Sequence, residues 1–265
     1  MKLTAQKKEI TKLLSTLSGR HWLVPMMTAL LVLILTIAAV VLTKNAQNSK
    51  VVPSSQTATI LPSESISLPK PDLRSGNSIE AVLKNRRSRR DYQDSSLSLK
   101  QVSQMLWAAQ GVTVDWGGRT TPSAKSTYPL SVYLIASKVE GLDPGEYQYI
   151  PGDRSPVHAL NPIKKVELQK ALYEAVNESS FKSAPAVLII TGSMGKMAEA
   201  YGGLPHDKEV YLEAGHAAQN LYLQAESLHL GMVTITSFSD IKVKDLVTIP
   251  SSETLIYLIP FGIPK

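Results

Sequence analysis

The pattern of apolar and polar residues predicts a long helix over residues 210–228. This stretch, VYLEAGHAAQNLYLQAESL, contains no proline, and its apolar residues fall on every side of a 3.6-residue wheel. A helix that is apolar all round is typical of a buried helix. Gly215 and the neighbouring alanines would let another backbone approach closely, at a helix or subunit contact. Gly231 is expected to cap the helix in a left-handed conformation.

Helical and strand patterns then interleave along the chain. Helices are expected from Ile79 into NRRSRRDY, and after Ser98 in LKQVSQMLWAAQG. An amphipathic helix is expected in VELQKALYEAV. Strands are expected in SVYLIAS, GEYQYIP, APAVLIITG, GMVTITSF and ETLIYLIPFG. The interleaving predicts one α+β or α/β domain over residues 77–265.

An uncharged apolar stretch precedes this domain. Residues 22–43 carry no charged side chain, and at about 1.5 Å per residue they could cross a hydrocarbon core of about 30 Å. We favour an uncleaved transmembrane anchor over a cleaved signal peptide, whose apolar core is only ~7–15 residues long. Basic residues gather in residues 1–21, so this segment is expected in the cytoplasm and the domain outside the membrane. Residues 44–76 are expected to form a linker, in which TATILP and ISLPKP could lie along the domain surface.

Composition narrows the classes of function. Hydrophobic residues make up 43% of the 265 residues, which is enough for a sizeable core. The absence of cysteine excludes disulfides, thiolate metal sites and a cysteine nucleophile. The net charge of +6 permits anionic partners, but nucleic acid is not expected because no nucleic-acid-binding motif accompanies the basic residues. Glu213 and His216 have the spacing of a metal-binding pair, but no second pair exists, so they are expected to be buried hydrogen-bond partners.

A basic cluster is the first candidate for chemistry. Arg86, Ser88 and Arg90 lie close together at the end of a predicted helix. Planar guanidinium groups match the oxygens of a phosphate two at a time. A solvated surface or a lipid-headgroup site has the same pattern, so the cluster alone leaves the function open.

Taken together, the segments resemble the nitroreductase family of flavin enzymes, and most closely its branch of azoline-oxidising (SagB-type) dehydrogenases. The matching stretches follow the family's order: IEAVLKNRRSRRDY, LSLKQVSQMLWAAQGV, GGRTTPSAKSTYPLSVYLIA, EGLDPGEYQYIP, SAPAVLIITG, LEAGHAAQNLYLQAESLHLGMVTI and IYLIPFGIPK. The resemblance implies an α+β fold with a mixed central sheet flanked by helices. It also implies a homodimer built on the long central helix, with FMN at the subunit interface.

The resemblance assigns three groups of flavin contacts, of which the second reaches the flavin of the other subunit. The group for the phosphate and ribityl chain is Arg86, Ser88 and Arg90, with Lys265 in place of the basic C-terminal residues of relatives. The loop group is Pro122, Ser123, Ala124 and Ser126. The group near the flavin ring is Asn177 and the N5-facing strip Thr234, Ile235, Thr236 and Ser237. Arg87 and Arg89 are then expected to be partly structural or surface charges.

The implied activity is a two-step exchange. A donor such as NAD(P)H gives a hydride to flavin N5 and leaves, and a small or peptidic acceptor then takes it. Tyr201 is the candidate acid or base. The chain departs from the family pattern in having Thr236 and Ser237 where glycine is usual, Lys125 after Ser-Ala, and Ala200-Tyr201 where azoline dehydrogenases have Lys-Tyr. The alternative function is therefore a membrane-tethered binding or scaffold domain with a degenerate flavin site.

Overall fold

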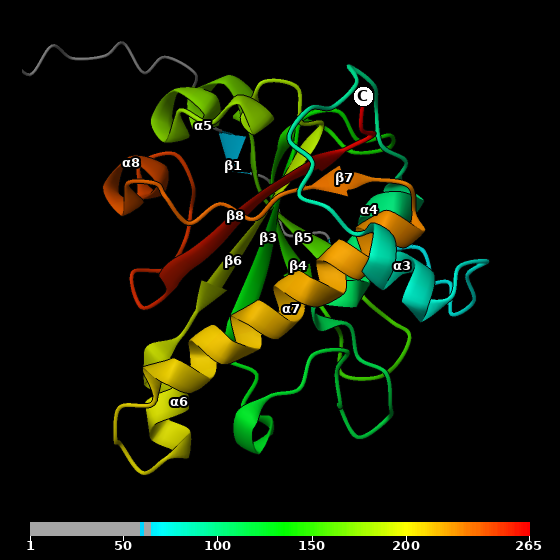
Figure 1. Ribbon diagram of the computed structural model, residues 1–265. Helices are drawn as coiled ribbons and strands as arrows, with labels where there is room; N and C mark the ends of the chain where they lie inside the picture. Colours follow the sequence, from blue (N-terminus) through cyan, green and yellow to red (C-terminus); the bar gives the residue numbers. More distant parts are fainter. Residues whose placement is uncertain (1–58, 61–64) are drawn as a thin grey trace, which may run out of the picture. The chain divides into compact units, whose positions relative to one another are not determined.

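The computed structural model describes residues 59–60 and 65–265 (Figure 1). The predicted cytoplasmic segment 1–21, the predicted anchor 22–43 and part of the predicted linker lie outside the described residues. Within the part that is described, no helix is both long and apolar enough to cross a membrane. The compact unit that holds the described residues spans Gln56–Lys265, so about two thirds of the sequence assigned to the linker, residues 56–76, belongs to this unit.

One eight-stranded sheet forms the centre of the domain, in the order β1-β5-β4-β3-β6-β8-β7, with β2 also paired to β5. The strands are β1 Thr59–Ile60, β2 Ile66–Ser67, β3 Leu130–Ala136, β4 Gly145–Ile150, β5 Ala159–Lys165, β6 Ala186–Gly192, β7 Gly231–Met232 and β8 Thr254–Gly262. Every pairing between these strands is antiparallel. The expected mixed sheet is therefore wrong. Short connections join β3 to β4 and β4 to β5, and parallel neighbours would need crossovers of about a dozen residues or more.

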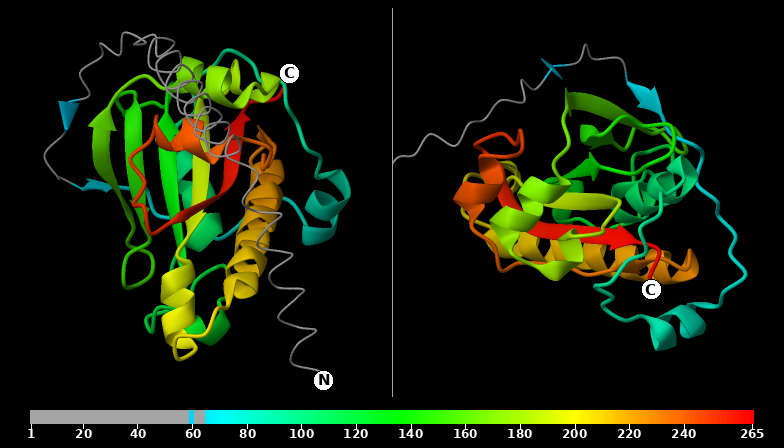
Figure 2. Two further views of the ribbon diagram at one scale, coloured as in Figure 1. Left: turned by 90° about the vertical axis from the view of Figure 1, so that its left-hand side faces the viewer. Right: turned by 90° about the horizontal axis from the view of Figure 1, so that it is seen from above.

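Helices cover both faces of the sheet (Figures 1 and 2). They are α3 Ile79–Asn85, α4 Leu99–Gln110, α5 Gln169–Val176, α6 Met194–Ala200, α7 Asp207–Ser227 and α8 Asp240–Lys244, with 3-10 turns η1 Ala124–Ser126 and η2 Ser179–Phe181. One buried cluster joins α4 and α7 to one face, and a second joins α5 and α8 to the other. The side chains of Ser78 and Ser98 cap α3 and α4, which confirms both predicted helix starts.

The long helix α7 differs from its prediction at its end and on one face. The left-handed residue after the helix is His229, with φ of 56°, whereas Gly231 belongs to β7. The predicted glycine cap is therefore wrong, because the chain has already turned back toward the sheet. The helix is not buried all round either, since Tyr211 and Leu212 are about half exposed, at 50% and 52%.

The segment before α3 is fastened to the domain. The pieces TATILP and ISLPKP contain β1 and β2, which pair with β5 at the edge of the sheet. Ser103 Oγ donates to the Pro69 carbonyl at 2.6 Å, and His158 Nε2 lies 2.9 Å from the same oxygen. His158 Nδ1 lies 2.9 Å from the Tyr149 hydroxyl. Burial lowers the pKa of His158, because a charged imidazole is disfavoured there.

Candidate functional site

Tyr222, on α7, joins three segments that carry predicted flavin contacts. Its hydroxyl accepts the Thr234 N–H at 3.1 Å and lies 3.1 Å from Ser88 Oγ. The guanidinium carbon of Arg86 lies 5.1 Å from the centre of the Tyr222 ring, within the range of a cation–π contact. The structure thus gathers Arg86, Ser88 and Thr234 around a side chain that the sequence pattern did not single out.

The surroundings of Tyr222 are electropositive. Burial would raise the pKa of its hydroxyl, but the hydrogen bonds to Ser88 and Thr234 and the charge of Arg86 outweigh burial. The pKa of Tyr222 therefore lies below its ordinary value. Among these causes, Arg86 is the full positive charge that could also act on a ligand.

Within the arginine cluster, two guanidinium groups have polar partners in the protein and two have no carboxylate partner among the described residues. Arg87 donates to two backbone carbonyls, at 2.8 and 3.0 Å, and Arg89 lies 3.8 Å from a carboxylate oxygen of Glu226. Among the described residues, no carboxylate lies within 4.0 Å of the Arg86 or Arg90 guanidinium. Arg86 and Arg90 are the two members of the cluster whose charges remain available to a ligand.

Buried contacts hold this cluster beside the C-terminal end of the chain. The Tyr92 side chain is fully buried, and its hydroxyl lies 2.8 Å from the Arg89 carbonyl and 2.9 Å from the Pro260 carbonyl. The backbone N–H of Lys265 donates to the Asp91 carbonyl at 3.2 Å. The backbone of Lys265 thus lies next to the residue that follows Arg90.

The predicted N5-facing strip runs along β8. Ile235 is buried and donates its backbone N–H to the Leu258 carbonyl at 2.9 Å. Thr234 is half-buried against Tyr222, while Thr236 and Ser237 are exposed. The strip therefore begins at the Tyr222 cluster and ends with two hydroxyl side chains facing solvent.

The loop formed by Pro122, Ser123, Ala124 and Ser126 has an unusual backbone. The backbone is left-handed at three residues, with φ of 52° at Lys125, 52° at Ser126 and 48° at Tyr128. Residues other than glycine and asparagine rarely adopt this conformation. Ser123 Oγ accepts the Tyr128 N–H at 2.8 Å, and Lys125 Nζ donates to the Ala200 carbonyl at 2.9 Å. Strain of this kind persists only where neighbouring contacts hold it, and it is common at functional sites.

One copy of the chain does not bring this loop to the arginine cluster. Ser123 lies near Glu213, in the first half of α7, whereas Arg86 and Ser88 lie at Tyr222, in its second half. Positions 213 and 222 are about 14 Å apart along a helix axis. Ser123 and the cluster therefore contact different parts of α7, while Thr121, just before the loop, is hydrogen-bonded to Asn220.

Tyr201 lies in a cluster of titratable side chains at the foot of α6. Its ring stacks on His206, with ring centres 3.7 Å apart and planes 19° from parallel. His206 Nδ1 lies 3.2 Å from a Glu209 carboxylate oxygen, and Lys125 Nζ lies 4.0 Å from the centre of the Tyr201 ring. Tyr201 and the Pro122–Ser126 loop are therefore in direct contact through Lys125.

The structure also locates Asn177, predicted near the flavin ring, and the pair Glu213 and His216, predicted to be buried hydrogen-bond partners. Asn177 ends α5 with a left-handed φ of 59°, on the face of the sheet opposite α7, and so lies apart from Arg86 and Ser88. Glu213 is buried and accepts from Gln110 at 3.4 Å, but His216 is exposed, because it lies on the open face of α7. The described residues contain no group of three metal-binding side chains.

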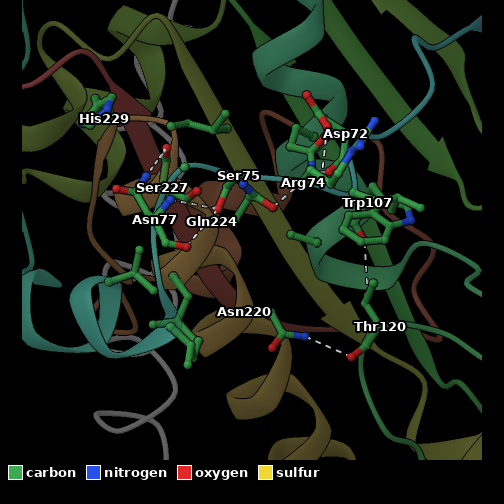
Figure 3. A pocket seen from close by; sticks show the side chains of 18 residues that line it. Asp72, Arg74, Ser75, Asn77, Trp107, Thr120, Asn220, Gln224, Ser227 and His229 are labelled. Atoms are coloured by element: carbon green, nitrogen blue, oxygen red, sulfur yellow. Dashed lines mark hydrogen bonds between the residues drawn. The ribbon is translucent and has the colours of Figure 1, made fainter.

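A cavity of about 820 Å³ lies beside the second half of α7 (Figure 3). Its walls come from residues 72–79, α3, α4 and α7. Polar side chains line much of the cavity, among them Gln104, Gln224 and Asn220. The side-chain amide of Asn220 donates to the Thr120 carbonyl at 3.1 Å. None of the predicted flavin contacts lines this cavity.

Comparisons with known families and sequences bear on the family of this chain. The model of the nitroreductase family matches residues 83–263, which include every predicted site residue except Lys265. A provisionally named nitroreductase of Methanocaldococcus jannaschii is 39% identical over 184 residues, covering 69% of this chain and 90% of that protein.

Solved structures show the same fold. A provisionally named nitroreductase of Ralstonia eutropha has a TM-score of 0.62 at 26% identity, covering 77% of this chain and 99% of that one. Another, from Anabaena variabilis, has a TM-score of 0.60 at 25% identity, covering 71% of this chain but only 38% of that longer chain. A microcin synthetase complex of E. coli, with a truncated precursor bound, shares the fold with a TM-score of 0.55 at 17% identity, covering 83% of this chain and 79% of that one.

Proposed function

The chain belongs to the nitroreductase family of oxidoreductases, and we propose that it binds FMN at a site that two copies of the chain complete together. The observation that carries the proposal is the available charge at the end of α3. Arg86 and Arg90 have no carboxylate partner among the described residues, and the Ser88 hydroxyl lies between them in sequence. Two guanidinium forks and a hydroxyl are suitable donors for a phosphate monoester.

A symmetric pair of chains would explain why the predicted contacts fall into two halves. The Pro122–Ser126 loop lies near the first half of α7 at Ser123, and the Arg86–Tyr222 cluster lies at its second half. A single copy of the chain therefore does not bring Ser123 and the cluster together. In a twofold dimer, the loop of one copy can meet the cluster of the other, and the reverse contact follows by symmetry. The exposed apolar side chains of Tyr211 and Leu212 on α7 would be covered by such a contact.

FMN, when bound, would supply the hydride chemistry between a donor such as NAD(P)H and an acceptor. The protein's part is to hold and orient. Arg86, Arg90 and Ser88 would hold the phosphate, and Tyr222 fixes Ser88 and Arg86 relative to the strip that begins at Thr234. Within that strip, Ile235 is paired with Leu258 of β8 by backbone hydrogen bonds in both directions.

Tyr201 is the side chain we propose for moving a proton to or from a substrate. The Lys125 ammonium lies 4.0 Å from the centre of its ring, and the His206 ring stacks on it. These two contacts would hold the Tyr201 ring in a fixed orientation toward a substrate. Lys125 from the neighbouring loop also donates to the Ala200 carbonyl, so an ammonium group lies beside the dipeptide Ala200-Tyr201.

Complementation between two defective variants tests the shared site. Arg86→Ala with Arg90→Ala should abolish FMN binding through the cluster, and Ser123→Ala with Ser126→Ala should weaken it through the loop. When the two variants are mixed and allowed to exchange subunits, each mixed dimer should regain one intact site, so about a quarter of all sites should bind FMN. No recovery in dimers that are shown to have exchanged would contradict a shared site.

The alternative is a binding or scaffold domain that keeps the fold without the cofactor. It is favoured by Thr236 and Ser237, whose exposed side chains stand where the family usually has glycine. Replacing both residues with glycine distinguishes the two functions. If the flavin site is intact, FMN affinity should change little, and if side chains block it, binding should appear only in the glycine variant.

A further inference from the structure

The central sheet opens between β3 and β4 at one end. β3 pairs with β4 only over Tyr133–Ala136, whereas it pairs with β6 from Leu130 onward. β4 continues along β5 as far as Ile150. Residues 130–132 and 149–150 therefore border a gap, where the backbone groups of one strand are not paired with the other strand and need other partners.

A cavity of about 380 Å³ lies at this end of the sheet. Ligand pockets have volumes of roughly 300–1,000 Å³, so this cavity has room for a small molecule or the end of a peptide. Its polar and charged lining includes Arg119, Ser131, Gln148, Ser193, Lys196 and Glu253. None of the residues proposed to hold FMN lines it.

Arg119 is the most informative residue of this lining. Its side chain is held by the Tyr128 ring, 4.5 Å from the guanidinium carbon, and by a 3.0 Å hydrogen bond to Gln110 Oε1. In the described part of the chain, no carboxylate lies within 4.0 Å of the guanidinium. Burial lowers the pKa of Arg119, which reflects the cost of keeping a charge there without an ion pair.

Among the residues that line the pocket, Arg119 and Lys196 outnumber the one carboxylate by one. Buried Glu213 lies behind the lining, where Gln110 contacts both Glu213 and Arg119. Lys196 Nζ donates to the Tyr128 carbonyl at 2.9 Å, so both cations of the pocket flank Tyr128. Glu253 is the carboxylate in the lining, and its oxygens accept from the hydroxyls of Ser131, Tyr133 and Thr191. Glu253 is thus already stabilised by hydroxyl donors and does not neutralise Arg119.

We propose that this pocket binds the carboxylate of an amide-bearing chain, supplied by a free acylated amino acid or by the C-terminus of a peptide. The planar fork of Arg119 matches a carboxylate, and Lys196 adds a second cation. The single surplus charge favours a monoanion over a phosphate dianion, which Glu253 would repel more strongly. The unpaired edges of β3 and β4 are suited to bind amide groups, as when an extended chain is added to a sheet.

Calorimetric titration of the full-length protein tests the site with defined probes. The probes are acetyl-dialanine with a free carboxylate, its carboxamide, and a longer alanine peptide with the same C-terminus. We expect the free carboxylate to bind and the carboxamide to bind at least about tenfold more weakly, since charge-assisted hydrogen bonds are lost. Equal binding of acid and amide would overturn the proposal, as would no binding of the acid at ~10 mM.

Variants locate the binding on the pocket. Lys196→Gln removes an exposed cation, and Arg119→Lys keeps the charge but loses the fork. Each should weaken binding of the acid at least about tenfold, while Lys208→Gln, which removes an exposed lysine outside the pocket, should leave it unchanged. If both pocket variants bind like the wild type, the carboxylate lies elsewhere and the proposal fails.

The longer peptide distinguishes the two sources of the carboxylate. If the longer alanine peptide binds as tightly as acetyl-dialanine, the rest of the peptide leaves the pocket through the open end of the sheet, as binding of a peptide C-terminus requires. Binding at least about tenfold weaker means that the pocket is closed behind two residues and takes a free acylated amino acid. Either result supports the site when acid and amide differ.

Discussion

Replacing Tyr222 with phenylalanine tests the hydroxyl that joins Ser88 to Thr234. The change keeps the ring, and with it the 5.1 Å contact of Arg86, but it removes the acceptor of the Thr234 N–H at 3.1 Å and the partner of Ser88 Oγ at 3.1 Å. A buried N–H left without an acceptor costs about 1–3 kcal/mol, and the half-buried N–H of Thr234 belongs at the low end of this range. We therefore expect Tyr222→Phe to lower the free energy of unfolding by about 1 kcal/mol.

The matched control is Tyr211→Phe on the same helix. Tyr211 is 50% exposed, so the loss of its hydroxyl should change the free energy of unfolding by less than about 0.5 kcal/mol. Both variants are measured by urea unfolding without flavin, followed by titration with FMN. Ser88 without its partner should be less well oriented, and FMN affinity should fall by roughly tenfold in Tyr222→Phe only.

A double-mutant cycle separates this contact from general destabilisation. Tyr222→Phe and Ser88→Ala remove the two sides of one hydrogen bond, so their effects on FMN affinity should be less than additive, with a coupling of about 0.5–1.5 kcal/mol. Additive effects would mean that Tyr222 does not orient Ser88. Equal stability and equal affinity of Tyr222→Phe and Tyr211→Phe would refute the reasoning as a whole.

Three further predictions concern ionisable side chains. Replacing both Arg86 and Arg90 with alanine should weaken FMN binding at least about a hundredfold in fluorescence titration, whereas Arg154→Ala, at an exposed arginine outside the cluster, should not change it. The pKa of His158 is lowered by burial, so the unfolded chain takes up a proton first and stability should fall as pH drops below about 6.5; urea unfolding should show this loss flattened in His158→Gln. The pKa of Glu213 is raised by burial, so the stability that its protonated form contributes is lost as pH rises above about 4.5. Glu213→Gln should therefore unfold at a higher urea concentration than the wild type at pH 8, and a lower urea midpoint would contradict this.

The sequence predicted the regular elements that carry strong local signals. Ser78 and Ser98 act as side-chain caps, and the apolar runs of β6 and β8 form strands, β6 buried throughout and β8 buried except at Thr254 and Tyr257. β5 had no such signal, because ALNPIKK contains Pro162 and does not alternate. Pro162 is tolerated beside the irregularity between Glu146 and Tyr147 of β4, where a missing backbone donor costs less.

The candidate site was predictable only in part, because its geometry is set by contacts far apart in sequence. The family pattern identified Arg86, Ser88 and Thr234, but Tyr222 looked like any apolar position on a buried helix. Its role depends on the meeting of α3, α7 and the strip after β7, which no local pattern encodes. The gap between β3 and β4 was likewise invisible, since both strands have ordinary strand sequences and only their register shows where pairing stops.

The visible absorption spectrum of the full-length protein, purified without added flavin, tests the central claim most directly. We predict a yellow protein whose denaturation releases FMN, identified by its mass, with about one flavin for each chain. A colourless protein that also fails to bind added FMN would contradict the claim, as would a released cofactor other than FMN.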